Sequence, residues 1–282
     1  MKINILLYTA VLMCFCTVLG CSSSGDDSDA GAVAVACGDS TGVYVRTNGD
    51  DSNPGTISRP KKTIQAAVIC SESGIPVRVA NGTYEVNFKD GNRISLSDGD
   101  SMYGGYSSDF LVRDPDIYPT IITDVTDIIT AGTSFMYAVD FSTVATPSTV
   151  VDGFTINVTS VGTGGDSIAI TVHGSPTITN NIINGGMNAG NGVSTGIEIF
   201  SGSPTITNNT IDGGIASSNS AGILSLISIG AVTITNNVIS GGATDDHYTY
   251  AIGLVAINTS GSVIKNNVIK VSRGGNASDG IH

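Results

Sequence analysis

The chain has 282 residues, of which 40% are hydrophobic and only 13% are charged, with 36 glycines, no tryptophan and a net charge of −12. Glycine does not recur at every third position, which excludes collagen, and the acidic balance argues against a nucleic-acid partner. Gly, Thr, Ser, Asn, Ile and Val dominate and are poor helix formers, so the composition disfavours an ordinary helical domain.

Residues 1–20 have the pattern of an export signal. Lys2 is followed by an apolar run that is short for a membrane span and that ends just before Cys21. Small residues before a cysteine, with a polar stretch after it, resemble a bacterial lipoprotein signal. The resemblance implies cleavage before Cys21, acylation of that cysteine, and attachment to the bacterial outer membrane or cell surface. A plain secretory signal is the alternative.

Residues 21–40 are rich in Ser, Gly and Asp, which predicts a flexible tether. Once a signal peptide and a lipid-bearing cysteine are set aside, Cys37 and Cys70 remain. An even pair of cysteines in an exported protein favours a disulfide, and two buried thiols are the alternative.

Residues 41–76 are predicted to form a small α/β cap. Residues 43–46 suit a short strand, residues 50–55 suit a turn, and residues 59–70 suit a helix. The side chains of Asp50, Asp51 and Asn53 carry oxygen ligands of the kind that calcium prefers, although such groups usually serve turns. Calcium is thus the one cofactor that the sequence offers; the spacing that zinc sites require is absent.

A repeat organises the remaining chain. A motif of the form Thr-Ile-Thr-Asn-Asn-x-Ile occurs three times, and a weaker copy follows at residues 263–269. The Asn pairs are separated by steps of 28, 28 and 30 residues, and a Gly-Gly pair closes the first three copies. The Asn pairs are Asn180–Asn181, Asn208–Asn209, Asn236–Asn237 and Asn266–Asn267. A repeat of this length without a helical period predicts a β-solenoid, whose coils bury their apolar faces by stacking.

The repeat also predicts where each coil turns. Stacking places Ile178, Ile206, Ile234 and Ile264 in one interior column and Ile183, Ile211, Ile239 and Ile269 in another. The two columns are five residues apart, an odd number, so strict alternation cannot bury both. The Asn pair between them is the predicted corner, because Asn tolerates left-handed backbone.

This pattern resembles the right-handed parallel β-helix of the pectin-lyase-like superfamily over residues 77–282. The segment before it is similar to the N-terminal cap of many uncharacterised bacterial β-helix proteins. The predicted fold is therefore an all-β, right-handed, single-stranded parallel β-helix with a small N-terminal α/β cap. Residues 279–282 begin another rung, so we expect the chain to be truncated at its C-terminus.

The resemblance raises the question of catalysis on polysaccharides. A lyase of that superfamily needs an Arg or Lys base, yet neither occurs between Asp114 and Lys265. The motifs of the polygalacturonases are incomplete and in a different order. We therefore assign no catalytic residue. The main hypothesis is a binding or structural scaffold for a polysaccharide or another surface protein, and the alternative is a polysaccharide lyase or glycoside hydrolase.

Ligand-binding candidates follow from the lack of tryptophan. Tyrosine must supply most of any aromatic platform for a glycan. The interval after the Gly-Gly pair at residues 241–242 is longer than its counterparts, so the sequence favours residues 245–248 as a functional loop. A plain solvated loop is the alternative. The candidates are Tyr103, Tyr106, Asp245, Asp246, His247 and Tyr248.

Overall fold

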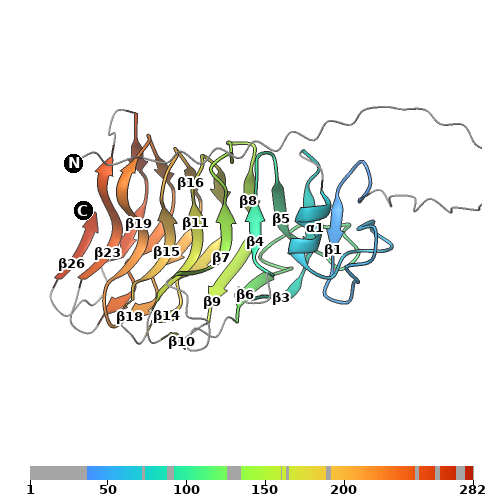
Figure 1. The fold of residues 1–282 in the computed structure, drawn as a ribbon, viewed down its shortest axis with the longest axis horizontal. Helices are drawn as coiled ribbons and strands as arrows, with labels where there is room; N and C mark the ends of the chain where they lie inside the picture. Colours follow the sequence, from blue (N-terminus) through green and yellow to red (C-terminus); the bar gives the residue numbers. More distant parts are fainter. Residues whose placement is uncertain are drawn as a thin grey trace, which may run out of the picture. The chain divides into compact units, whose positions relative to one another are not determined.

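The computed structural model describes residues 37–71, 74–87, 92–125, 135–159, 161–162, 165–188, 192–244, 248–257, 261–270 and 277–281. In these residues the chain is nearly all β, with one helix and with strands that stack in parallel from turn to turn (Figure 1). The predicted all-β parallel solenoid is confirmed. No helix among the described residues is long and apolar enough to cross a membrane.

Four parallel sheets form the faces of the solenoid, and successive turns, or rungs, extend them strand by strand. The first sheet contains β1 (Val43–Val45), β2 (Val77–Ala80), β5 (Ser101–Tyr106), β8 (Val150–Asp152), β12 (Thr177–Thr179), β16 (Thr205–Thr207), β20 (Thr233–Thr235) and β24 (Val263–Lys265). The second contains β3 (Gly82–Val86), β6 (Thr120–Asp124), β9 (Phe154–Val158), β13 (Ile182–Asn184), β17 (Thr210–Asp212), β21 (Val238–Ser240) and β25 (Val268–Lys270).

The third sheet has longer strands and the fourth has very short ones. The third contains β4 (Ile94–Leu96), β7 (Phe135–Phe141), β11 (Asp166–Val172), β15 (Ser194–Ile199), β19 (Ser220–Ile229), β23 (Tyr248–Ile257) and β26 (Ala277–Ile281). The fourth contains β10 (Val161–Gly162), β14 (Met187–Asn188), β18 (Ile215–Ala216) and β22 (Ala243–Thr244).

The register of the strands confirms both predicted isoleucine columns. Ile178 pairs with Ile206, then Ile234 and Ile264, on the first sheet. The column that begins at Ile183 runs in the same way through the second sheet. The side chains are fully buried except at the last rung, where Ile264 and Ile269 pack against the core but stay partly exposed.

The Asn pair forms the predicted corner between the first two sheets. The first Asn of each pair adopts left-handed backbone, with φ between 55° and 60°, at Asn180, Asn208, Asn236 and Asn266. The second Asn points inward and builds a ladder along the stack. The Oδ1 of Asn209, for example, accepts hydrogen bonds from the backbone N–H of Asn181 (2.9 Å) and from its Nδ2 (3.1 Å). Its own Nδ2 donates to the carbonyl of Ile178 (2.9 Å).

The helix α1 (Ile64–Cys70) starts five residues later than the sequence predicts. The carboxylate of Asp51 accepts hydrogen bonds from the backbone N–H groups of Lys62 (2.9 Å) and Thr63 (2.8 Å), which holds this segment outside the helix. Lys61 also pairs with Val45 as an isolated bridge. Thr63 then caps the helix by accepting a hydrogen bond from the N–H of Ala66.

The segment before the repeats is built into the solenoid. Its strand β1 pairs in parallel with β2, so that Val43 lies opposite Val77 and Val45 opposite Val79. A disulfide joins Cys37 to Cys70, whose Cα atoms are 5.5 Å apart. It ties the start of the described chain to the last residue of α1.

Candidate functional site

Tyr103 and Tyr106, two of the tyrosines selected from the sequence, lie on the same surface of β5. Residues three apart in a regular strand face opposite sides. Here the register against β2 shifts, because Tyr103 lies opposite Arg78 whereas Tyr106 lies opposite Ala80. One extra residue in β5 makes this a β-bulge. Gly105 has φ of 82°, a left-handed value that glycine accepts readily, and this turn brings both rings to one face.

Arg78 of β2 places a guanidinium among these rings. Its central carbon lies 5.7 Å from the ring centre of Tyr106 and 5.9 Å from that of Tyr44, both within cation–π range. In the described part of the chain, the side chain of Arg78 has no ion-pair or hydrogen-bond partner. Its charge contributes, behind the hydroxyl of Thr41 and backbone N–H groups, to lowering the pKa of Asp39.

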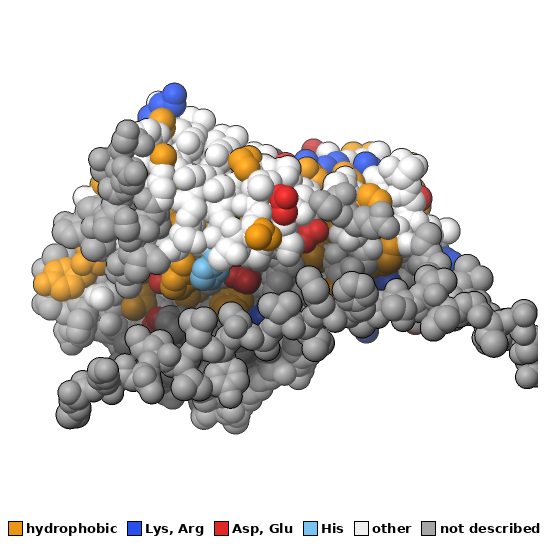
Figure 2. Space-filling model, turned by 45° about the horizontal axis from the view of Figure 1, so that its top comes forward, with side chains coloured by type: hydrophobic (Ala, Val, Ile, Leu, Met, Phe, Trp, Pro, Cys, Tyr) orange, Lys and Arg blue, Asp and Glu red, His pale blue; other side chains and the backbone are white. Residues whose placement is uncertain are grey.

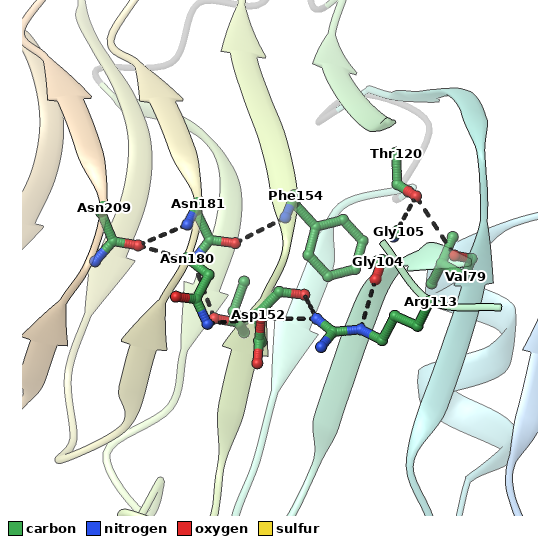
Figure 3. Close-up of polar contacts among 11 residues, drawn as sticks. Val79, Gly104, Gly105, Arg113, Thr120, Asp152, Phe154, Asn180, Asn181 and Asn209 are labelled. Atoms are coloured by element: carbon green, nitrogen blue, oxygen red, sulfur yellow. Dashed lines mark hydrogen bonds and ion pairs between the residues drawn. The ribbon is translucent and has the colours of Figure 1, made fainter. Parts of the chain in front are cut away.

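Arg113 completes the cluster from the loop that follows β5 (Figure 3). Its Nε donates to the carbonyl of Gly104 (2.9 Å), and its Nη2 forms an ion pair with Asp152 (2.7 Å). The guanidinium also lies 5.5 Å from the ring centre of Tyr103 and 5.9 Å from that of Tyr106. Tyr106 therefore lies within cation–π range of two arginines, of which Arg113 is paired with a carboxylate and Arg78 is not.

Phe110 anchors the loop that carries Arg113. Its backbone is left-handed, with φ of 63°, which is costly for a bulky residue and persists only where packing compensates. The ring is 7% exposed and packs edge-on against Tyr44, with the ring centres 4.9 Å apart. Backbone hydrogen bonds from Ser107 N to Val112 O and from Asp114 N to Gly105 O close the loop. Local strain of this kind is concentrated at functional sites.

Arg78, Arg113 and the two tyrosines of β5 line a cavity of about 660 Å³, which we call the arginine–tyrosine cleft. It is formed by Gly74, Pro76, Arg78, Gly99, Ser101, Tyr103, Tyr106, Arg113 and Ser148. The cleft lies in the one stretch of the chain that is rich in basic residues, because most of the 12 Lys and Arg residues fall between Arg46 and Arg113. Figure 2 shows basic side chains gathered mainly toward one end of the face in view.

A second cluster lies on the third sheet. His173 stacks on Phe200 of the next rung, with ring centres 4.8 Å apart and planes 10° from parallel. Its Nε2 is 3.9 Å from the Oδ1 of Asp140, which also accepts a hydrogen bond from Thr171 (2.6 Å). A small cavity of about 220 Å³ opens beside Tyr137, His173 and Phe200. Figure 2 shows a histidine beside acidic and hydrophobic side chains.

Glu198 adds a carboxyl group with a raised pKa to this sheet. It lies opposite Thr171 on one side and Leu224 on the other, and it is only 6% exposed. Burial, assisted by the nearby carboxylate of Asp166, raises the pKa of Glu198 to about 7. Asp140 also lies opposite Thr171, so the two carboxyl groups flank that threonine from neighbouring rungs.

A family model described as a protein of unknown function, DUF1565, matches residues 47–281. The chain belongs to the DUF1565 family. The match includes both the arginine–tyrosine cleft and the regular rungs, so the two occur within one family unit. No curated protein and no solved structure matches the chain.

The structure separates the other candidates taken from the sequence. Tyr248 is on the third sheet, 45% exposed and stacked on Tyr250 at 6.2 Å between ring centres, so it does not share a surface strand with Tyr103. Asp245, Asp246 and His247 lie outside the described residues, as does the proposed lipid-bearing Cys21.

The side chains considered for calcium serve the local backbone. Asp50 accepts from Ser52, Asp51 from Lys62 and Thr63, and Asn53 donates to the carbonyl of Pro60. No cluster of three metal-binding His, Cys, Asp or Glu side chains occurs within the described ranges.

Sequence reasoning did not select Arg78, Arg113 or Phe110. For Arg78 a signal was present, because it alternates with the core residues Val77 and Val79 and must face outward. For Arg113 and Phe110 we find no such signal. Their positions depend on the bulge in β5 and on a left-handed Phe, and neither belongs to the repeat.

Proposed function

We propose that this member of the DUF1565 family is a lipid-anchored protein of the bacterial cell envelope. Its solenoid presents the arginine–tyrosine cleft, which binds an acidic glycan. The observation that carries the proposal is Arg78, a guanidinium without an anionic hydrogen-bond partner among the described residues, held against tyrosine rings at the wall of an open cleft. The export signal and Cys21 support the location.

The chemistry of the cleft favours a sugar that carries a carboxylate. A guanidinium presents a planar fork of donors that matches a carboxylate group. The tyrosines Tyr103 and Tyr106 offer apolar ring faces together with hydroxyl groups, which suits the mixed surface of a sugar. Ser101 and Ser148 add further polar groups to the lining. The stretch from Arg46 to Arg113 opposes an anion less than the rest of this acidic chain does, because its eight basic residues balance its eight acidic ones.

Binding of uronic-acid oligosaccharides, measured by titration calorimetry against neutral oligosaccharides of equal length, tests this function. We expect the Arg78→Gln variant to lose affinity by on the order of tenfold, the usual size of a lost charge-assisted hydrogen bond. Lys265→Gln is the matched control, because it removes an equal charge at the other end of the same sheet. Equal binding by Arg78→Gln and the control would overturn the assignment of the cleft.

The lipid anchor is tested separately. In the native host, Cys21→Ala should move the protein from the detergent phase to the aqueous phase after detergent partitioning. Ser22→Ala alters the next residue without touching the acylated sulfur, and it should leave the partitioning unchanged. If the Cys21→Ala protein stays in the detergent phase, the anchor lies elsewhere.

Hydrolysis of a glycoside is a second candidate function, favoured by Asp140 and Glu198. Two strand spacings separate these residues, about 9–10 Å between their Cα atoms. Inverting glycosidases use a pair of carboxyl groups, one as general acid and one as general base. Glu198 would protonate the leaving oxygen while Asp140 takes a proton from the attacking water. Release of reducing ends that Glu198→Gln abolishes would support this function, and the absence of release from a polysaccharide panel would reject it.

A further inference from the structure

The loop between β5 and β6 presents large apolar side chains to solvent. Leu111 is 81% exposed, and its neighbour Val112 and Ile117 of the same loop are each more than half exposed. Single apolar residues on a protein surface are ordinary, whereas several large ones in one short segment are typical of a contact with a partner or a membrane. This group, which we call the apolar loop cluster, belongs to neither of the sites described above.

The backbone of the loop holds the apolar loop cluster in place. Phe110 anchors one side of it in the core of the early rungs, as described above. The carboxylate of Asp109 accepts a hydrogen bond from the N–H of Leu111 (3.2 Å), and that of Asp114 accepts one from the N–H of Ile117 (3.3 Å). Two of the acidic side chains of the loop thus fix its turns, and the apolar ones are left on the surface.

The loop packs on the strand that follows the predicted tether. The ring of Phe110 contacts that of Tyr44 in β1, and the Tyr44 hydroxyl lies 2.6 Å from the hydroxyl of Thr41. Cys37 lies sixteen positions after Cys21. A flexible chain of that length, as the composition predicts, has a root-mean-square span of about 20–24 Å. A lipid on Cys21 therefore keeps the loop within a short distance of a bilayer.

Charge favours the early rungs as the part of the solenoid that meets a membrane. From Asp114 to Asp246 the chain has eleven acidic residues and no basic one, whereas charges balance between Arg46 and Arg113. Arg46, which donates to the carbonyl of Ser108 (3.2 Å), and Arg113 also offset part of the negative charge of the loop. A bilayer with anionic lipids repels the acidic rungs and opposes the early ones little.

We propose that the apolar loop cluster is a second membrane contact, in which Leu111, Val112 and Ile117 enter the interface of the bilayer that holds the lipid of Cys21. This inference rests on the proposed lipid anchor and adds an orientation, with the early rungs at the membrane and the acidic rungs projecting from it. The anchor makes the second contact intramolecular, so a small apolar surface is sufficient.

The sequence contains no tryptophan, so a single introduced one reports its own surroundings. Leu111→Trp is the probe. Val268→Trp is the matched control, because Val268 is also exposed and its strand β25 lies five strand spacings, about 24 Å, from β6 in the second sheet. Each lipidated full-length protein is reconstituted into vesicles of phosphatidylethanolamine and phosphatidylglycerol, with or without bromine on the acyl chains.

We expect brominated lipid to reduce the emission of Leu111→Trp at least about twofold and to leave that of Val268→Trp unchanged, because an inserted side chain reaches the acyl boundary. Unquenched emission from both, with the protein still in the vesicles, would overturn the inference and leave the lipid anchor standing. Equal quenching of both would mean that the solenoid lies along the bilayer, which contradicts the orientation. If the wild type does not enter the detergent phase, the anchor fails and the inference fails with it.

A second copy of this chain is the alternative occupant of the apolar loop cluster. The Cys21→Ala protein, which carries no lipid, separates the two. We expect it to be monomeric by light scattering and to bind the same vesicles weakly, with a further loss on the order of tenfold in Cys21→Ala/Leu111→Ser, as for a buried leucine side chain. A dimer of Cys21→Ala that Leu111→Ser dissociates would make the loop an interface between copies, and the membrane assignment would be wrong.

Discussion

The rungs that contain β1 to β6 and those that contain β12 to β21 share one architecture, but the later rungs are regular and the early ones are not. The later rungs repeat one solution, with the same left-handed Asn, the same inward Asn and the same isoleucine columns. The early rungs depart from it through the bulge in β5, the left-handed Phe110 and a group of basic residues. Regular rungs therefore supply the stacked core, and the irregular ones supply the cleft.

The two regions also differ in the contacts by which neighbouring rungs stabilise one another. In the regular rungs each inward Asn bonds to the rungs on both sides of it, as Asn209 does with Asn181 and Asn237. In a stacked repeat, stability is approximately a sum of such neighbour interactions, so one lost residue weakens two interfaces. The early rungs add single contacts, such as the disulfide Cys37–Cys70, to their strand pairing.

The largest expected effect is that of Ile206→Asp. Ile206 is fully buried between Ile178 and Ile234, so the variant must place a carboxylate in the core or unfold. We expect loss of the folded state, seen as loss of the β signal in circular dichroism. Ile182→Asp is the control, because that side chain is 49% exposed on the outer surface of the second sheet. A wild-type melting curve for Ile206→Asp would refute the assignment of Ile206 to the core.

Asn209→Leu should be the next most damaging change. It leaves the backbone N–H of Asn181 and the carbonyl of Ile178 without these partners in a buried site. At about 1–3 kcal/mol for each unsatisfied group, the expected loss of stability is about 4 kcal/mol, measured as a shift in the urea midpoint. The adjacent Asn208→Gly removes only an exposed amide. Its loss of stability should be at most a few tenths of the loss expected for Asn209→Leu. Similar midpoints for the two variants would show that the ladder carries no stability.

Ile206→Asp and Asn209→Leu test the two features of the fold that the sequence predicts. The isoleucine columns and the Asn corner follow from a period of 28 residues, because any side chain that recurs at one position must meet its own copies. The cleft had no such period to reveal it. Tyr103 and Tyr106 were selected by residue type alone, and only the shifted register between β2 and β5 brings them together with Arg78. The late start of α1 depends likewise on one long-range contact, that of Asp51 with Lys62 and Thr63.

Removal of the disulfide should affect the early rungs alone. The chain-entropy model gives about 3–4 kcal/mol for a bond that closes a loop of 33 residues. In the variant Cys37→Ser/Cys70→Ser, we expect hydrogen exchange to accelerate in β1 and α1 while β12, β16 and β20 keep their protection. Faster exchange in all of these strands at once would mean that the solenoid unfolds as one unit, and the proposed division between regular and irregular rungs would not hold.

The smallest expected effect comes from Glu198, and its sign depends on pH. The pKa of this carboxyl group is raised from 4.5 to about 7, chiefly by burial. Between these two values the folded state holds a proton that the unfolded state has released, so stability falls as the pH rises through this window and stays lower above it. The difference is at most about 3 kcal/mol.

Glu198→Gln should remove this decline, so that the variant matches the wild type near pH 4 and is more stable at pH 8. Unfolding by urea across this range measures the effect. Glu85→Gln, at an exposed position of β3, is the control and should keep the wild-type slope. If Glu198→Gln keeps that slope as well, the carboxyl group is ionised at neutral pH. A general acid would then be unavailable on the third sheet, and hydrolysis there would lose its support, whereas the arginine–tyrosine cleft of the early rungs would be unaffected.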